Sequence, residues 1–384
     1  MSAAPAASKP AQPLYFINGP VDFLLIGGLS IITLIAFYVS DLAKIDAYDK
    51  TTGKAHIVTT ITLWLMVVCN WPHFAASSYR LYQTKSNIRQ YPMTALALPW
   101  VIIAFALASF WQPLVVAPLF VKLFLVWSPY HFSGQTIGVS LIYFRRAGIR
   151  ISYWMRLALS TFVYGTFISM SIRAEYGLGS FDYYTIKYPT FGLPDWGRDT
   201  FLHQPILSVI TEVIMYMGGI AFLGLSALWM KENKRLMPAI VFLPAITQFF
   251  WFVVAARMPN YNQMVPFFHS MQYLLIAWSM QMKETLDRKH ERPSILFVLK
   301  ESAIWSAFVL IGGSLLFSKE FGLPKLCMKE FDVSIDFAAG IVLAAVQIHH
   351  FFVDGVIWKL KSTSVSSPLM VNIDDLIHEK EGSV

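Results

Sequence analysis

The sequence is short of charge and of cysteine. Of its 384 residues, 14% are Asp, Glu, Lys or Arg and 56% are hydrophobic, and the mean hydropathy is +0.53. Soluble domains contain about 25% charged residues, so this balance excludes an ordinary soluble protein. The only cysteines are Cys69 and Cys327, which excludes a disulfide framework and a thiolate metal site of the CxxC type.

Two further patterns are absent. Although the net charge is +7, Lys and Arg stand in short groups between apolar runs, which is typical of membrane topology and not of a nucleic-acid surface. We therefore expect no nucleic-acid partner. The sequence also lacks the clustered HxxxH and HxxHH boxes of common membrane desaturases and hydroxylases, because its only adjacent histidines are His349 and His350.

Apolar runs of about 20 residues, the length of a helix that crosses a bilayer, recur along the chain. They predict an all-α, polytopic integral membrane bundle with about ten transmembrane helices. The expected spans are 21–40, 57–79, 93–110, 114–144, 154–172, 206–230, 237–256, 264–282, 303–317 and 334–358.

The same patterns predict domains and orientation. We expect a disordered amino-terminal segment over 1–20, a single transmembrane helical domain over 21–360 and a polar, mobile cytoplasmic tail over 361–384. Lys and Arg are more frequent in the connections on the side of the amino terminus, so both termini are predicted to be cytoplasmic. We expect the membrane to be a bacterial inner (cytoplasmic) membrane.

Four predicted spans carry histidines flanked by aromatic and small residues, and a proline precedes three of these histidines. An isolated membrane histidine usually makes an interhelical hydrogen bond, but ionisable groups on four spans indicate a functional site. Neutral imidazoles can hold Fe, Zn or Cu without several buried carboxylates. The candidate metal ligands are His73, His131, His269, His349 and His350.

Depth supports three of these positions. Under the predicted topology all four spans run in the same direction, and His73, His131 and His349 lie at similar distances from the start of their spans. His269 lies only a few residues into its span. Either that boundary is misplaced, or Pro266 opens a helix that begins below the membrane surface.

Polar residues share helical faces with these histidines. Gln135 lies near His131 in sequence and Tyr273 lies near His269, while Asp354 follows His350 by four residues. Such groups can hydrogen bond the remote ring nitrogen and fix the imidazole tautomer. The candidate catalytic residues are therefore Asp354, Tyr273 and Gln135.

These segments resemble motifs of the Brp/Blh family of membrane β-carotene 15,15′-dioxygenases, which cleave a carotenoid into retinal. Trp71-Pro72-His73 is similar to the Pro-His motif of that family, and His131-Phe132-Ser133-Gly134 to its His-Phe-Gly motif. Phe268-His269-Ser270 is similar to its Ile-His-Ser motif. The segment from His349 to Asp354 is similar to its final histidine, which an aspartate follows five residues later.

The resemblance implies an all-helical membrane fold and a non-haem iron held by His73, His131, His269 and one of His349 and His350. The offset to Asp354 favours His349, whereas helical geometry favours His350, so both stay candidates. The carboxylates of the family correspond here to Ser77 and to Gln135 or Thr136, and its second histidine in the third motif corresponds to Tyr273.

The sequence thus favours a His-ligated, membrane-embedded oxygenase or related oxidoreductase. Its partners would be membrane lipid and an apolar, carotenoid-like or lipid-like substrate. One alternative is a proton-coupled transporter that uses the histidines, Asp354 and Glu212. Another is an accessory subunit of a larger membrane complex that binds haem or pigment. Ligand type alone also permits Zn or Cu.

Overall fold

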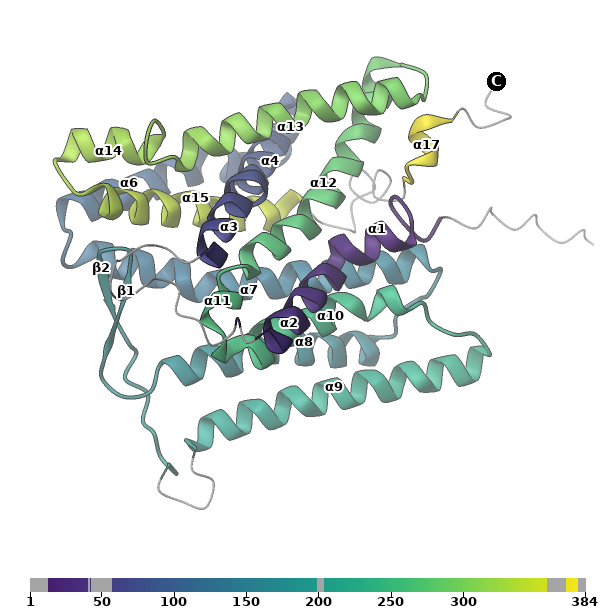
Figure 1. Ribbon diagram of the computed structural model, residues 1–384, viewed down its shortest axis with the longest axis horizontal. Coiled ribbons are helices and arrows are strands. Elements are labelled where there is room, and N and C mark those ends of the chain that lie inside the picture. Colours follow the sequence, from purple (N-terminus) through teal and green to yellow (C-terminus); the bar gives the residue numbers. More distant parts are fainter. Residues whose placement is uncertain (1–12, 41, 43–56, 199–203, 358–370, 379–384) are drawn as a thin grey trace, which may run out of the picture.

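The computed structural model describes residues 13–40, 42, 57–198, 204–357 and 371–378, which form a helical bundle with one small hairpin (Figure 1). The first elements are α1 (Gly19–Phe23), η1 (Leu24–Gly28), α2 (Leu29–Val39), α3 (Ile57–Leu65), η3 (Met66–Asn70), α4 (Trp71–Tyr82), α5 (Lys85–Gln90), η4 (Met93–Ala97), α6 (Leu98–Trp111), α7 (Val116–Arg146) and α8 (Tyr153–Ala174).

A hairpin of β1 (Ser180–Tyr183) and β2 (Ile186–Pro189) separates these helices from the second group. The remaining elements are α9 (Ile206–Asn233), η5 (Ala239–Val241), α10 (Leu243–Phe249), η6 (Phe250–Val254), η7 (Ala255–Arg257), α11 (Pro259–Asn262), α12 (Val265–Lys289), α13 (Ile295–Phe317), α14 (Leu323–Phe331), α15 (Ile335–Ile357) and α17 (Asp374–Ile377).

Each of the ten predicted spans coincides with a helix or a series of joined helices, and the all-α membrane bundle is confirmed. Seven helical stretches in the described part of the chain are long and apolar enough to cross a membrane. They are Gly19–Val39, Ile57–Tyr82, Met93–Trp111, Tyr153–Ala174, Ile206–Asn233, Ile295–Phe317 and Ile335–Ile357.

The other three predicted spans are α7, α12 and the shorter apolar helix Leu243–Val254. The long helices α7 and α12 carry many buried polar side chains, including His131 and His269. One boundary was predicted poorly. The helix expected from 303 begins at Ile295, because Glu301 interrupts the apolar run, yet it is buried and accepts from Lys289 Nζ at 2.6 Å.

Several spans contain π-helical turns, which occur at η1, η3, η4 and η6. Two of them, η3 and η4, are followed by helices with proline in the first turn, at Pro72 and Pro99. Proline has no N–H for the ordinary helical ladder, so a wider turn is a natural join at such positions. The turn at η3 leads directly into the segment that carries His73.

The beginning of α12 explains the unusual position of His269. Pro266 lies in the first turn of α12, and Met264 and Val265 at its start are buried, as is Tyr261 of the preceding α11. In Figure 1, α12 starts in the middle of the bundle beside α11. Of the two alternatives, the structure therefore favours a helix that opens inside the protein.

The predicted disorder of residues 1–20 is wrong for the part that the structure describes. Phe16 is fully buried, and the backbone amides of Phe16 and Ile17 donate to Asp22 at 2.7 and 2.9 Å. Tyr143 Oη of α7 also donates to Asp22, at 2.7 Å. A buried carboxylate with three donors explains why this segment is ordered. Residues 1–12 lie outside the described residues.

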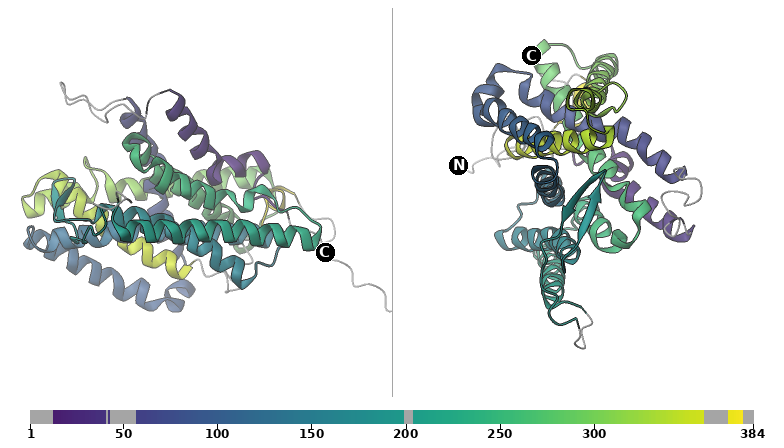
Figure 2. Two further views of the ribbon diagram at one scale, coloured as in Figure 1. Left: turned by 90° about the horizontal axis from the view of Figure 1, so that it is seen from below. Right: turned by 90° about the vertical axis from the view of Figure 1, so that its left-hand side faces the viewer.

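The predicted mobile tail, 361–384, needs a similar correction over 371–378. The Ile373 amide donates to the Phe16 carbonyl at 2.8 Å, and Arg146 of α7 donates to the Val371 carbonyl at 2.6 Å. Both terminal segments therefore lie at one end of the bundle, opposite the β1–β2 hairpin (Figures 1 and 2). Their assignment to the cytoplasmic side stays a prediction.

Candidate metal centre

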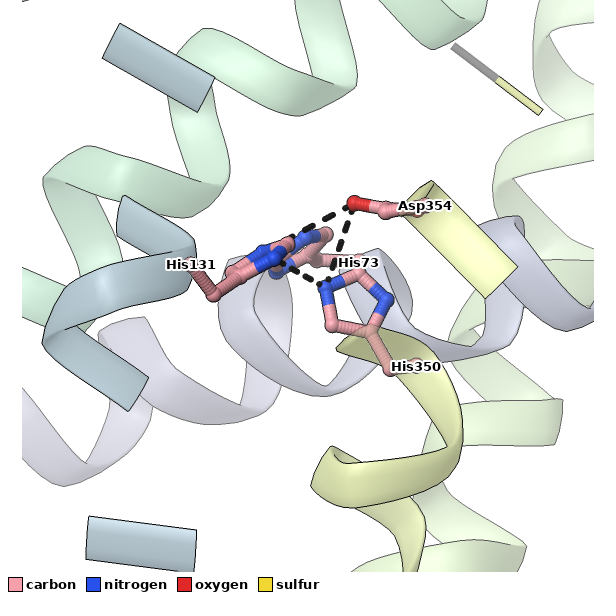
Figure 3. A group of neighbouring side chains, drawn as sticks. All are labelled: His73, His131, His350 and Asp354. Carbon is pink, nitrogen blue, oxygen red and sulfur yellow. Dashed lines mark hydrogen bonds and ion pairs between the residues drawn. The ribbon is translucent and has the colours of Figure 1, made fainter. Parts of the chain in front are cut away.

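Three helices from distant parts of the chain bring four buried side chains together. They are His73 of α4, His131 of α7, and His350 and Asp354 of α15. Each offers one donor atom, and these four atoms all lie within 4.8 Å of one another (Figure 3). The exposed fraction is 9% or less for every one of them. The group thus forms a compact centre inside the bundle.

The separations within the centre suit ligands of a single ion. His350 Nε2 lies 3.1 Å from His131 Nε2, and Asp354 Oδ2 lies 3.4 and 3.7 Å from these two nitrogens (Figure 3). Ligands that each stand about 2.1 Å from a tetrahedral ion are about 3.4 Å apart. Small side-chain adjustments would therefore bring these donors to an ion.

Hydrogen bonds to two serines orient two of the imidazoles. His73 Nδ1 lies 3.1 Å from Ser270 Oγ, which itself donates to the carbonyl of Pro266 or the side chain of Asn70. Ser270 thus accepts from His73 Nδ1. The opposite nitrogen, His73 Nε2, is buried and has no hydrogen-bond partner. That arrangement leaves the lone pair of Nε2 available to a metal.

Ser77 does the same for His350. Its Oγ lies 2.8 Å from His350 Nδ1, 3.1 Å from Asp354 Oδ1 and 2.6 Å from Tyr273 Oη. Tyr273 Oη also donates to Asp354 Oδ1 at 3.4 Å. Ser77 therefore connects an imidazole, the carboxylate and the phenol. Sequence reasoning did not select Ser77 as a site residue, although it follows His73 by one helical turn.

His269 lies beside this group. Its ring stacks on Phe132 with centroids 3.8 Å apart, and the centroids of His73 and His131 are 5.2 and 5.3 Å away. Both ring nitrogens of His269 are buried without a hydrogen-bond partner. A buried polar atom that lacks a partner is costly, so His269 is a fifth potential donor at the same centre.

The structure distinguishes between the two adjacent histidines of α15. His350 faces the centre, whereas the His349 ring stacks on Tyr82 with centroids 6.4 Å apart. Consecutive helical residues point about 100° apart, so both cannot face one point. Of the two candidates, His350 therefore lies at the centre, as helical geometry favours, and His349 does not.

Two predicted contacts differ from those observed. Asp354 was expected at the remote nitrogen of His350, but Ser77 occupies that position and Asp354 Oδ2 lies on the Nε2 side. Gln135 makes no hydrogen bond to the His131 ring; its Nε2 donates to the His269 carbonyl at 2.9 Å, and its Oε1 has no partner. Asp354 is thus placed as a potential ligand, and Gln135 as a residue that supports α12.

A cavity of about 300 Å³ adjoins the centre and reaches His131 and Asp354. Most of its wall is aromatic or aliphatic, and glycines form part of it. We call it the aromatic cavity. Its lining residues are Trp127, Tyr130, His131, Gly134, Gln135, Gly138, Val139, Ile142, Tyr164, Tyr273, Ile276, Phe351, Asp354 and Gly355.

The donor set fits a divalent metal ion. Imidazoles and a carboxylate are the ligands of non-haem Fe(II) sites and also of Zn sites. His73 Nε2 has no hydrogen-bond partner, and His73 belongs to the same cluster of donors as the carboxylate of Asp354. A cation bound by this cluster would compensate the buried negative charge of Asp354.

Comparison with known proteins adds no family assignment, because no family model, curated protein or solved structure matches this chain.

Proposed function

We propose that this chain is a membrane-embedded, non-haem-iron oxidoreductase that acts on a lipid-soluble substrate. The observation that carries the proposal is the convergence of four buried donors, of which two line the aromatic cavity. The four are His73, His131, His350 and Asp354, and the two at the cavity are His131 and Asp354. Iron bound by these residues would supply oxygen activation, as the resemblance to the carotenoid dioxygenases implies. A carotenoid-like or lipid-like molecule is the proposed substrate, and a bacterial inner membrane the proposed location.

The cavity wall supports access from the bilayer. Gly134 of α7 and Gly355 of α15 line the cavity and are exposed, and Tyr130 is 49% exposed. A Cβ placed on Gly138 or Gly355 would meet no atom within 4 Å. Glycines of α7 and α15 therefore leave open space beside the cavity, which would admit an elongated apolar molecule from lipid.

The residues of the cavity have separable roles in this proposal. Trp127 and Phe351 would align an apolar chain by contact, at about 25 cal/mol per Å² of area removed from water and less for a substrate already in lipid. Tyr273 would hold a proton at its Oη, within reach of Ser77 and Asp354. Ser77 keeps the His350 Nε2 atom directed at the centre.

The alternatives have less support. Four donors that approach one point leave little room for a porphyrin, which occupies four equatorial positions of its iron. The transporter hypothesis relied in part on Glu212, but this carboxylate pairs with Arg173 and stands apart from the histidine group. A bare ion is thus the occupant that these contacts favour.

Metal analysis of the purified protein tests the proposal. We expect near-stoichiometric iron in detergent-purified protein, without the absorption bands of haem. His350→Ala should lose most of this iron, since it removes a donor. His349→Ala is the matched control, because it changes the neighbouring imidazole that faces Tyr82, and it should keep the iron. A folded protein that contains no metal after iron supplementation would refute the proposal.

A further inference from the structure

Buried polar atoms without a hydrogen-bond partner occur at a second place in the described chain, besides the histidine centre. Thr136 Oγ1, Ser140 Oγ, Thr247 Oγ1 and Gln248 Oε1 all lack a partner, and their four side chains are fully buried. Native proteins rarely leave such atoms unsatisfied. We use the name polar seam for Ser133, Thr136 and Ser140 of α7, Thr166 of α8, and Thr247 and Gln248 of α10.

On α7, two hydroxyl groups of the seam lack the hydrogen bond to their own helix that such groups commonly make. Helical serines and threonines commonly donate to the carbonyl four residues earlier, as Ser133, Ser109 and Ser226 do at 2.7 to 2.9 Å. Thr136 and Ser140 make no such bond. They follow Ser133 at intervals of three and four residues, so all three hydroxyls lie on one face of α7. Two of them are free to bind something else.

The opposite wall comes from α10. Gln248 Nε2 lies 2.7 Å from Ser133 Oγ, 3.0 Å from the Val163 carbonyl and 3.1 Å from Thr166 Oγ1. These contacts fix the amide in the seam while its Oε1 stays unpartnered. Thr247 Oγ1 lies against the backbone of Gly27, where an added Cβ would come within 2.0 Å of it.

Other buried polar groups of the bundle lie near the two ends of the seam. At one end, Gln135 lines the aromatic cavity, and its Oε1 is also unpartnered. At the other end, Tyr143 of the same face donates to the buried carboxylate of Asp22. The eight steps along the chain from residue 135 to residue 143 rise about 12 Å along α7. Asp22 lies at the end of the bundle where the terminal segments pack.

We propose that the polar seam binds a file of water molecules that connects the Asp22 end of the bundle with the aromatic cavity. Side chains three or four positions apart on a helix are about 5–6 Å apart, and one water bridges about 5.6 Å with two ordinary hydrogen bonds. The free groups are neutral hydroxyls and amide oxygens, which together both donate and accept, as water requires.

The role of this file is proton supply to the cavity, and that part rests on the proposed oxidoreductase function. Hydroxyls and water in a row can pass protons between Asp22 and Tyr143 at one end and Gln135 at the other. The binding of water itself does not depend on that function, so the two ideas fail separately.

Radiolytic labelling in heavy-oxygen water tests the file directly. A hydroxyl radical formed from a bound water labels an adjacent ring, even when the ring is fully buried. Tyr143 and Tyr261 are both 0% exposed, but Tyr261 is bonded to Ser30 and lies in another part of the core. We expect Tyr143 to be labelled at least about fivefold faster than Tyr261. Equal, slow labelling of the two tyrosines would overturn the proposal.

Isosteric variants give a second, independent measurement. In Thr136→Val the shape is kept and the hydroxyl is lost, and we expect slower labelling of Tyr143 and a lower melting temperature because bound water loses a partner. If the seam were dry, the valine would remove an unsatisfied hydroxyl and raise the melting temperature. A rise with unchanged labelling would therefore contradict the file, whether or not the protein contains iron.

Discussion

At the scale of single residues, Ser77 connects three other side chains at the centre. It contacts His350, Asp354 and Tyr273 and shares α4 with His73. Ser77 itself is not one of the candidate metal ligands. Its effect on the centre is to hold the ring of His350 and the carboxylate of Asp354 in fixed orientations, as groups behind metal ligands generally do.

Ser77→Ala should weaken metal binding by about 10- to 100-fold, the usual effect of removing a partner behind a metal ligand. Competition with a chelator measures this change. Ser77→Thr keeps the hydroxyl and should recover much of the affinity. Ser109→Ala is the control, because Ser109 is equally buried but donates only to its own helix at Phe105. Unchanged affinity in Ser77→Ala would contradict the role given to Ser77.

At the scale of elements, α7 separates two environments. Its Gly134 and Gly138 line the aromatic cavity beside His131, whereas Ser133, Thr136 and Ser140 face the polar seam. Because a helix turns by about 100° per residue, one helix can present both faces without a break. The glycines leave open space on the cavity side, and the hydroxyls make the seam side polar, with Gln135 of the cavity wall directly before Thr136 in the chain.

Gly138→Leu should obstruct the cavity while leaving the metal centre in place. A Cβ at Gly138 meets nothing within 4 Å, so the larger side chain would occupy the space without displacing a helix. We expect iron to be retained and the affinity for parinaric acid, a fluorescent apolar polyene, to fall by at least about tenfold, or about 1.4 kcal/mol.

Gly224→Leu on α9 serves as the comparison for that experiment, because Gly224 also has open space around it and does not line the cavity. Equal binding of the polyene by the two variants would show that the probe does not use the aromatic cavity.

At the scale of the whole molecule, the two terminal segments are joined at one end of the bundle. Arg146 at the end of α7 donates to the Val371 carbonyl, and its guanidinium lies 3.9 Å from the centre of the Phe16 ring. One side chain thus contacts both segments. They cover the region next to Asp22, where the polar seam ends.

Arg146→Ala should release both segments without unfolding the bundle. We expect limited proteolysis to cleave the chain near its two ends several times faster than in the unchanged protein, with the iron content preserved. Arg145→Ala, which removes an exposed neighbour on the same helix, should leave the cleavage rate unchanged. Equal cleavage rates in the two variants would show that the contacts of Arg146 do not hold the terminal segments in place.

Much of the architecture was readable from the chain alone. Runs such as 206–230 predicted helices because a backbone in lipid must satisfy its own hydrogen bonds, and α9 (Ile206–Asn233) confirms it. Histidines in apolar runs likewise predicted a functional site with five candidate ligands, because ionisable groups on four such runs are rarely accidental. The candidates were His73, His131, His269, His349 and His350. Local composition is sufficient for both conclusions.

Tertiary structure decided the rest. Ser77 and His350 are 273 positions apart, and only the packing of α4 against α15 brings them into contact. Packing also decides three other contacts: His349 stacks on Tyr82, Asp354 lies on the Nε2 side of His350, and the Ile373 amide donates to the Phe16 carbonyl. Hydropathy predicts which segments become helices, but not which faces of those helices meet, because that depends on side-chain fit between segments remote in the chain.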